Sequence, residues 1–260
     1  MERRKFIQNA ISFTALITIH QQAQALAALS MATNKLKACR FKEITLFTSE
    51  LDEQFEFYSG VLGFLVIEKL KDQFSMQIGE SVLHFKRAKV GTTPFYHYAI
   101  NIPSNKYKLA KQWLAERTEL LKVGGTDIDL LYFDFWDAHA MYFRDPSGNI
   151  GELISRHTLD NDTQGEFGID DLLCVSEIGT PVDDIYDLGQ SLKEAYGLDI
   201  YGESMFIGDE LGMYVAVPVG RSWYPENVQR AEVHPTEIIT NDEGIDNYQY
   251  KNYPYHIKRK

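Results

Sequence analysis

The stretch that decides the fold is Tyr142-Phe-Arg-Asp-Pro-Ser-Gly-Asn-Ile-Gly-Glu-Leu153. Its centre, Asp145-Pro-Ser-Gly148, combines the residues that form tight turns, and so predicts a turn between two strands. The second of these strands carries Glu152, a residue type that binds divalent metals. The stretch therefore predicts a strand pair with a candidate ligand on its second member.

This stretch closes the second of two copies of one pattern, which runs strand, helix, strand, strand, strand. The first copy covers residues 41–90 and opens with Phe41-Lys-Glu-Ile-Thr-Leu-Phe-Thr48. The second copy covers residues 95–156 and opens with His97-Tyr-Ala-Ile-Asn-Ile-Pro103. A repeat constrains the architecture and shows which positions are equivalent.

Four residues of metal-ligand type fall at equivalent positions of the two copies. Glu43 matches His97 near the start of each first strand, and His84 matches Glu152 in each last strand. Since strand side chains alternate between faces, the four would converge if the two sheets curl toward each other. Two imidazoles and two carboxylates suit Fe(II), Mn(II), Ni(II) or Zn(II) better than calcium. An octahedral ion held in this way keeps two positions open for a substrate.

Other residues are candidates for the substrate pocket. His139 lies one strand from Glu152 and would either line the pocket or replace one ligand. Arg221 could hold a substrate carboxylate or phosphate, and a surface salt bridge is the alternative for it. The expected aromatic wall of the pocket includes Tyr98, Trp136 and Tyr142.

A third unit, over residues 168–240, has the same order of elements but fewer residues of ligand type. We expect it either to cover the open end of the cup or to form a dimer contact. The remaining residues, 241–260, are polar and rich in tyrosine, and are predicted to form a surface tail.

The quoted motifs, together with Val61-Leu-Gly-Phe64, resemble the vicinal oxygen chelate superfamily over residues 41–158. That superfamily includes glyoxalase I, bleomycin and fosfomycin resistance proteins, and extradiol ring-cleaving dioxygenases. The resemblance implies an α+β fold of paired βαβββ modules that form a cupped mixed sheet around a divalent metal, followed here by a third, degenerate module. It places the metal ligands at Glu43, His84, His97 and Glu152.

The resemblance leaves the reaction open. A glyoxalase-type lyase or isomerase would chelate two neighbouring substrate oxygens, with Glu152 or Glu43 moving a proton. Glyoxalase I usually has His or Gln at the position of Glu43 and Glu at that of His84, so these two types look exchanged. An Fe(II) dioxygenase uses two His and one Glu, from which Glu43 departs. A resistance-type protein would bind a small molecule without metal.

Net charge and cysteine content limit the kinds of partner and of site that the sequence predicts. The formal charge of −11 argues against a nucleic-acid surface, which needs clustered cations. The expected partner is a small-molecule substrate, as the resemblance implies. The two cysteines, Cys39 and Cys174, lie far apart without CxxC spacing. We therefore expect buried free thiols rather than a disulfide or a zinc site.

Residues 1–30 have the order of an export signal. Arg3-Arg4 precedes a short apolar run from Ala10 to Ile19, and small residues follow around Ala25. The run is too short to span a bilayer core of about 30 Å, so lasting membrane insertion of the mature chain is not expected. The arginine pair resembles a twin-arginine signal, which exports folded proteins. The alternatives are an amphipathic leading helix, or a start at Met31 and a cytoplasmic protein.

Overall fold

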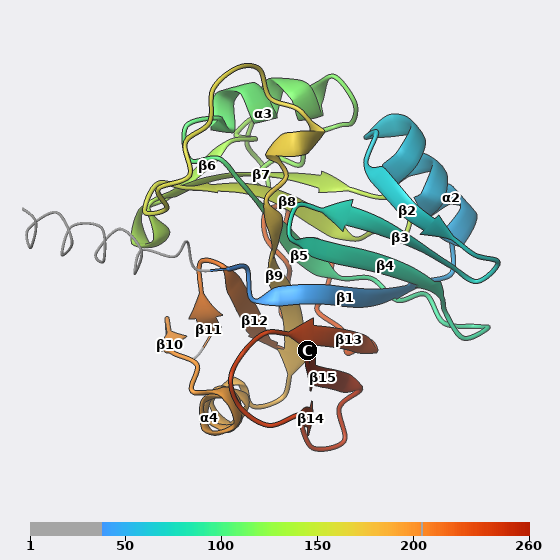
Figure 1. Ribbon diagram of the computed structural model, residues 1–260, viewed down its shortest axis with the longest axis vertical. Helices are drawn as coiled ribbons and strands as arrows, with labels where there is room; N and C mark the ends of the chain where they lie inside the picture. Colours follow the sequence, from blue (N-terminus) through green and yellow to red (C-terminus); the bar gives the residue numbers. More distant parts are fainter. Residues whose placement is uncertain (1–37, 204) are drawn as a thin grey trace, which may run out of the picture. The chain divides into compact units, whose positions relative to one another are not determined.

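Two curled mixed sheets carry the fold in this computed structural model (Figure 1). The structure describes residues 38–203 and 205–260, so the predicted export signal at residues 1–30 lies outside it. No helix in the described residues is long and apolar enough to cross a membrane.

The eight-stranded sheet has the order β10-β11-β12-β9-β5-β8-β7-β6. One half consists of β5 (His97–Ile102), α3 (Tyr107–Ala115), β6 (Leu131–Phe133), β7 (Ala138–Arg144) and β8 (Ile150–Arg156). The other half consists of β9 (Cys174–Val182), α4 (Ile185–Tyr196), β10 (Ile200–Tyr201), β11 (Phe206–Asp209) and β12 (Gly212–Pro218). In each half the first and last strands are parallel, and β5 runs antiparallel to β9.

The seven-stranded sheet has the order β14-β15-β13-β1-β4-β3-β2. Its larger part consists of β1 (Phe41–Thr48), α2 (Leu51–Glu56), a π-helical turn (Phe57–Val61), β2 (Leu65–Lys69), β3 (Gln73–Ile78) and β4 (Ser81–Arg87). Its smaller part consists of β13 (Thr236–Thr240), β14 (Asn247–Gln249) and β15 (Tyr255–Arg259). The pairing repeats that of the other sheet, because β1 is parallel to β4, β13 is parallel to β15, and β1 is antiparallel to β13.

Strand alternation decides which face of each sheet enters the core. In β1 and β4 the apolar side chains Ile44, Leu46, Leu83 and Phe85 are fully buried, and they belong to one cluster that also contains Tyr98 of β5. Their polar neighbours in sequence point to the opposite face. Each sheet therefore gives one face to a shared core and keeps the other face for polar side chains.

The α+β architecture of cupped mixed sheets is confirmed, but the expected partnership of the two copies is wrong. We expected residues 41–90 and 95–156 to form one cup. Instead each copy lies in its own sheet, because β9 takes the free edge of β5 and β13 takes the free edge of β1.

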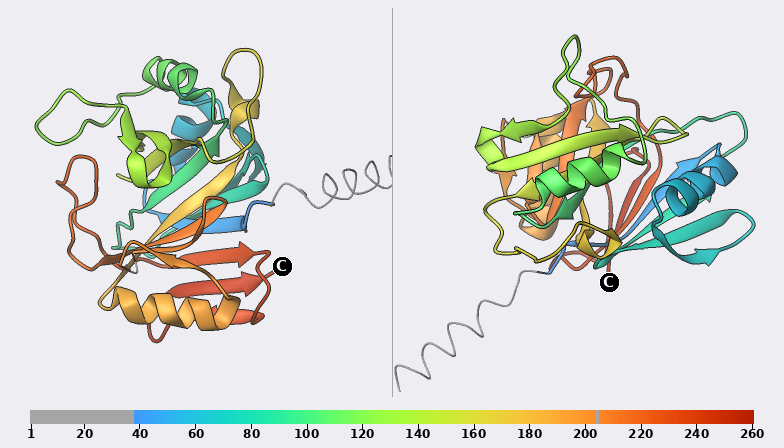
Figure 2. Two further views of the ribbon diagram at one scale, coloured as in Figure 1. Left: turned by 90° about the vertical axis from the view of Figure 1, so that its left-hand side faces the viewer. Right: turned by 90° about the horizontal axis from the view of Figure 1, so that it is seen from above.

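The C-terminal residues 241–260 are also corrected, since they do not form a surface tail. Tyr255 and Ile257 of β15 are buried, as are Tyr248 and Tyr250 before them. The Tyr248 hydroxyl hydrogen-bonds to Ser191 in α4 at 2.9 Å. Figure 2 shows α4 beside the strands at this end of the chain. The alternation of apolar and polar residues in β15 is typical of a strand with one buried face, and not of a solvated extension.

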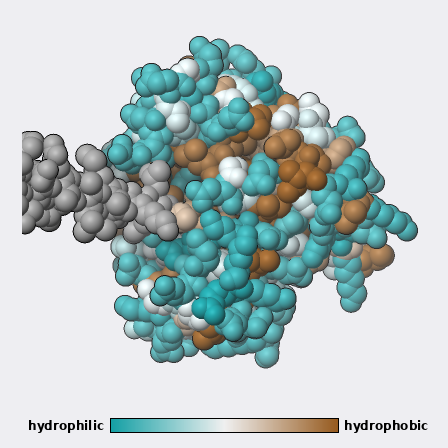
Figure 3. Space-filling view, viewed as in Figure 1, coloured by the Kyte–Doolittle hydropathy of each residue, from teal (hydrophilic) through white to brown (hydrophobic). Residues whose placement is uncertain are grey.

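An apolar edge remains exposed at β2, the outer strand of the seven-stranded sheet. Leu65, Ile67 and Leu70 are each at least half exposed there, and Figure 3 shows apolar residues gathered on this face. The dimer contact expected of residues 168–240 is a separate prediction, which stays open.

Cys39 and Cys174 form a disulfide, so the prediction of free thiols is wrong. Cys39 lies just before β1 and Cys174 begins β9, so the bond joins the two sheets. A separation of 135 residues carries no local signal of pairing. The fold brings the two Cα atoms to 6.3 Å, within the usual range for a disulfide.

We predict that the double variant Cys39→Ser/Cys174→Ser loses about 2–4 kcal/mol of unfolding free energy, because the bond closes a long loop in the unfolded chain. Urea denaturation of both proteins measures this. Reductant should lower the midpoint of the wild type and leave that of the variant unchanged. Equal midpoints for the oxidised wild type and the variant would contradict the prediction.

Candidate metal centre

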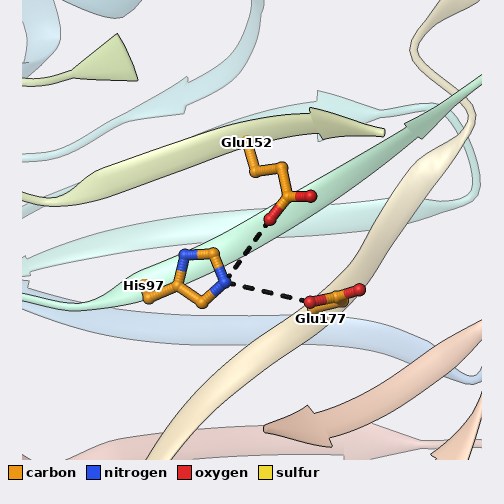
Figure 4. A group of neighbouring side chains, drawn as sticks. All are labelled: His97, Glu152 and Glu177. Atoms are coloured by element: carbon orange, nitrogen blue, oxygen red, sulfur yellow. Dashed lines mark ion pairs between the residues drawn. The ribbon is translucent and has the colours of Figure 1, made fainter. Parts of the chain in front are cut away.

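His97, Glu152 and Glu177 converge on one face of the eight-stranded sheet (Figure 4). The His97 Nε2 atom lies 3.5 Å from Oε2 of Glu152 and 3.8 Å from Oε2 of Glu177. All three side chains are buried. Within the described residues, no other group of three or more His, Cys, Asp or Glu residues has ligand atoms this close together.

Strand register explains why these three side chains meet. Glu152 of β8 and Glu177 of β9 both lie opposite Ala99 of β5, from its two sides. His97 is two residues before Ala99, so it points to the same face of the sheet. Three adjacent strands thus each contribute one ligand type to the same spot.

His97 is oriented as a ligand. Its Nδ1 atom donates to the carbonyl oxygen of Ile150 at 3.2 Å. This leaves Nε2 facing the two carboxylates. A hydrogen bond that fixes one ring nitrogen while the other faces the ion is the usual arrangement of metal-binding histidines.

A buried arginine organises the third residue. Arg156 is fully buried and donates from Nη2 to Oε1 of Glu177 and from Nε to Oδ1 of Asn101. Burial alone would raise the pKa of Glu177, but the neighbouring His97 ring, whose Nε2 atom lies 3.8 Å away, and the charge of Arg156 outweigh it and lower that pKa. Glu177 therefore stays ionised, with Oε2 turned toward His97.

Glu152 differs from Glu177. Burial, and then the neighbouring charge of Glu177, raise the pKa of Glu152 well above its ordinary value, although Arg156 and the hydrogen bond with Tyr142 oppose the rise. The elevated pKa reflects a buried carboxyl group without a full ion-pair partner of its own. A divalent cation at this point would supply the missing charge.

The donor set fits a transition-metal dication. One imidazole and two carboxylates, opposed by the single charge of Arg156, suit Mn(II), Fe(II), Ni(II) or Zn(II). The position in β12 that corresponds to Glu152 is Val215, which lies opposite Gly179, two residues after Glu177. Valine offers no ligand atom, so His97, Glu152 and Glu177 would hold the ion and would leave other coordination positions for substrate or water.

A cavity of about 220 Å³ opens over this group. Trp223 forms part of its wall, with its ring centroid 5.3 Å from that of His97. Gly179 allows this contact, because a Cβ atom there would lie 2.7 Å from the Trp223 ring. Most of the lining is apolar or aromatic, and consists of His97, Phe133, Trp136, Tyr142, Glu152, Ile154, Glu177, Met205, Phe206, Val215, Arg221, Trp223 and Tyr224.

The four predicted ligands do not meet. His97 and Glu152 lie in the centre, whereas Glu43 and His84 lie together in the seven-stranded sheet, 3.2 Å apart. Glu43 consequently does not line the cavity over His97, so the prediction that Glu43 moves a proton there is wrong. The third ligand type, Glu177, was missed. It stands in the first strand of the third unit, so extending the repeat alignment to that strand could have found it.

The predicted pocket residues divide in the same way. Trp136, Tyr142 and Arg221 line the cavity. Tyr98 does not, because it follows His97 and points into the core, where its hydroxyl meets that of Tyr58. His139 lies elsewhere, stacked on a tyrosine ring and hydrogen-bonded to a second histidine.

Comparison with known proteins identifies the class of fold. No family model and no curated protein matches the sequence. Among solved structures, a putative dioxygenase from Bacillus subtilis subsp. subtilis str. 168 is similar over 86% of each chain, with a TM-score of 0.55 and 16% identity. Glyoxalase I from Zea mays matches 78% of this chain and 75% of its own, with a TM-score of 0.46 and 17% identity.

A lactoylglutathione lyase from Agrobacterium tumefaciens matches 46% of this chain and 96% of its own, with a TM-score of 0.37 and 18% identity. The similarity to the putative dioxygenase shows a shared fold, and the two mixed sheets agree with the α+β fold that the sequence motifs predict. At these identities the similarity defines the fold, and the chemistry must be argued from the site.

We predict that His97→Ala, Glu152→Ala and Glu177→Ala each weaken the tightest binding of Mn(II), Ni(II) or Zn(II) by more than about 100-fold, since even the loss of a residue that only hydrogen-bonds to a ligand costs about 10–100-fold. Calorimetric titration of the metal-stripped protein measures this. Glu43→Ala is the matched control and should leave the tightest event unchanged. An equal loss in Glu43→Ala would contradict the assignment.

Proposed function

We propose that this protein is a divalent-metal-dependent enzyme of lyase or isomerase type, which acts on a small substrate with two neighbouring oxygens. The observation that carries the proposal is the buried group of His97, Glu152 and Glu177 at an aromatic cavity. A bound dication would supply stabilisation of negative charge on the substrate oxygens.

The two carboxylates have different tasks in this proposal. Glu177 is held ionised by Arg156 and serves to bind and orient. Glu152 has the raised pKa and contacts the Tyr142 hydroxyl, which suits a group that takes a proton from one substrate carbon and returns it to another. Two carboxyl groups whose surroundings separate their pKa values are a recurrent acid–base arrangement.

The cavity suggests the kind of substrate. Its volume suits a small molecule, and aromatic walls such as Trp136 and Trp223 favour a flat or apolar body. Arg221, which makes no ion pair within the described residues, would bind a carboxylate or phosphate of the substrate.

Arg221→Met should then raise KM about tenfold for acidic substrates only, measured in parallel on an acid and its amide.

A second candidate is an Fe(II) ring-cleaving dioxygenase. Val215 leaves three protein ligands, which is the number in the facial triad of non-haem iron oxygenases. That triad has two histidines and one carboxylate, whereas this centre has one histidine and two carboxylates, so we rank the dioxygenase second. Oxygen uptake with catechols and Fe(II) would favour it.

A third candidate is a metal-free binding protein that uses the aromatic cavity alone. Purified protein that retains no metal, with ligand binding unchanged in Glu152→Ala, would favour this candidate over both enzymes.

We predict that the protein loaded with Mn(II), Ni(II) or Zn(II) isomerises or cleaves hemithioacetals or related 2-hydroxycarbonyl compounds. Glu152→Gln should lower kcat by about 10²–10⁴-fold, the usual contribution of a general base. Glu43→Gln is the control and should retain activity. Metal content is measured for each protein, so that loss of metal is separated from loss of the base. Absence of turnover with every metal would count against the proposal.

We also propose that the chain is exported. The arginine pair and apolar run of residues 1–30 support this, and so does the Cys39–Cys174 disulfide, since such bonds persist mainly outside reducing compartments. Cell fractionation of a bacterial host that expresses the chain with and without Arg3→Lys/Arg4→Lys tests it. Equal cytoplasmic retention of both forms would contradict export.

A further inference from the structure

We propose that the seven-stranded sheet contains a second divalent-cation site, formed by Glu43, His84 and Glu237, in which Lys86 competes with the ion for one ligand. The proposal concerns the opposite sheet from the candidate metal centre. It does not depend on which reaction that centre performs.

Strand register is the first argument. His84 of β4 and Glu237 of β13 both lie opposite Thr45 of β1, and Glu43 stands two residues before Thr45. The candidate metal centre has the same geometry, in which two ligand types lie opposite Ala99 and the third stands two residues before it. Both sheets thus place one histidine and two glutamates at corresponding positions, with the histidine on a different strand.

The orientation of His84 is the second argument. Its Nδ1 atom is hydrogen-bonded to Oγ of Ser75 at 2.8 Å, and its Nε2 atom lies 3.2 Å from Oε2 of Glu43. A fixed Nδ1 and an Nε2 directed at a carboxylate repeat the arrangement of His97. Only 16% of the His84 side chain is exposed, so the ring is held rather than free in solvent.

A cavity of about 390 Å³ lies over these residues. Its lining is mainly polar or charged and consists of Glu43, Thr45, Gln73, His84, Lys86, Glu237, Ile238, Ile239, His256 and Lys258. A hydrated ion with its remaining water ligands fits such a space better than an apolar molecule does.

Lysines distinguish this cavity from the candidate metal centre. The Lys86 Nζ atom lies 3.0 Å from Oε2 of Glu237 and holds that carboxylate. Lys258 occupies the position that corresponds to Val215, opposite Ile239. Glu237 must leave Lys86 to join His84 and Glu43, and it can do so readily because exposed ion pairs contribute little to stability.

These contacts predict the order of affinities. The group around His97 is buried and already gathered, so it binds first. The group around His84 is more exposed and must displace Lys86, so it binds a second ion more weakly. Removing the Lys86 charge should strengthen this second event.

The test is calorimetric titration of the metal-stripped full chain with Ni(II), repeated with Zn(II). We expect two ions per chain, one tight and one weak. His84→Ala and Glu237→Gln should abolish the weak event and retain the tight one, which also shows that the variants are folded. Lys86→Met should tighten the weak event about tenfold. Lys42→Met, which breaks the exposed ion pair with Glu80 on the same sheet, is the matched control and should change neither event.

One ion per chain in both the wild type and Lys86→Met would overturn the proposal, as would an unchanged weak event in Glu237→Gln. Failure of the candidate metal centre is distinguishable, since His97→Ala would then leave the titration unaltered while the variants of His84 and Glu237 would still remove a binding event.

Discussion

The antiparallel pairing of β5 with β9 is the constraint on which the rest of the structure depends. This ladder sets Glu177 opposite Ala99 and next to His97, and so completes the candidate metal centre. It also occupies the edge of β5 that would otherwise be open to β1. With that edge taken, β1 pairs with β13, and the C-terminal strands become part of a sheet.

The same pairing accounts for the unequal electrostatics of the centre. Two carboxylates are brought together in a buried place, where Coulomb repulsion is poorly screened. One of them, Glu177, is compensated by Arg156, and the other, Glu152, has its pKa raised by burial. A single buried arginine beside one of the two carboxylates leaves a deficit of positive charge, which a bound cation would offset.

Local sequence signals predicted the elements well, because they depend on short-range chemistry. The turn at Asp145-Pro-Ser-Gly148 and the alternation in β5 identified the strands that carry Glu152 and His97. What the sequence could not determine is which module pairs with which. Several strands have similar patterns of apolar residues, so the local sequence does not determine which strands pair. Long-range packing decides the pairing. The ligand Glu177, the disulfide and the fate of the C-terminal tyrosines all follow from that choice.

The order of the strands along the chain determines when each sheet can form during synthesis. The eight-stranded sheet uses a continuous stretch of chain, from β5 to β12, whereas the seven-stranded sheet joins the first strand to segments at the far end. β1 must therefore wait for β13 and β15 to leave the ribosome, and contacts of such long sequence separation form slowly. A chain built in this way completes its seven-stranded sheet only after β15 has left the ribosome, so any carrier that accepts folded cargo alone would meet it with both sheets already synthesised.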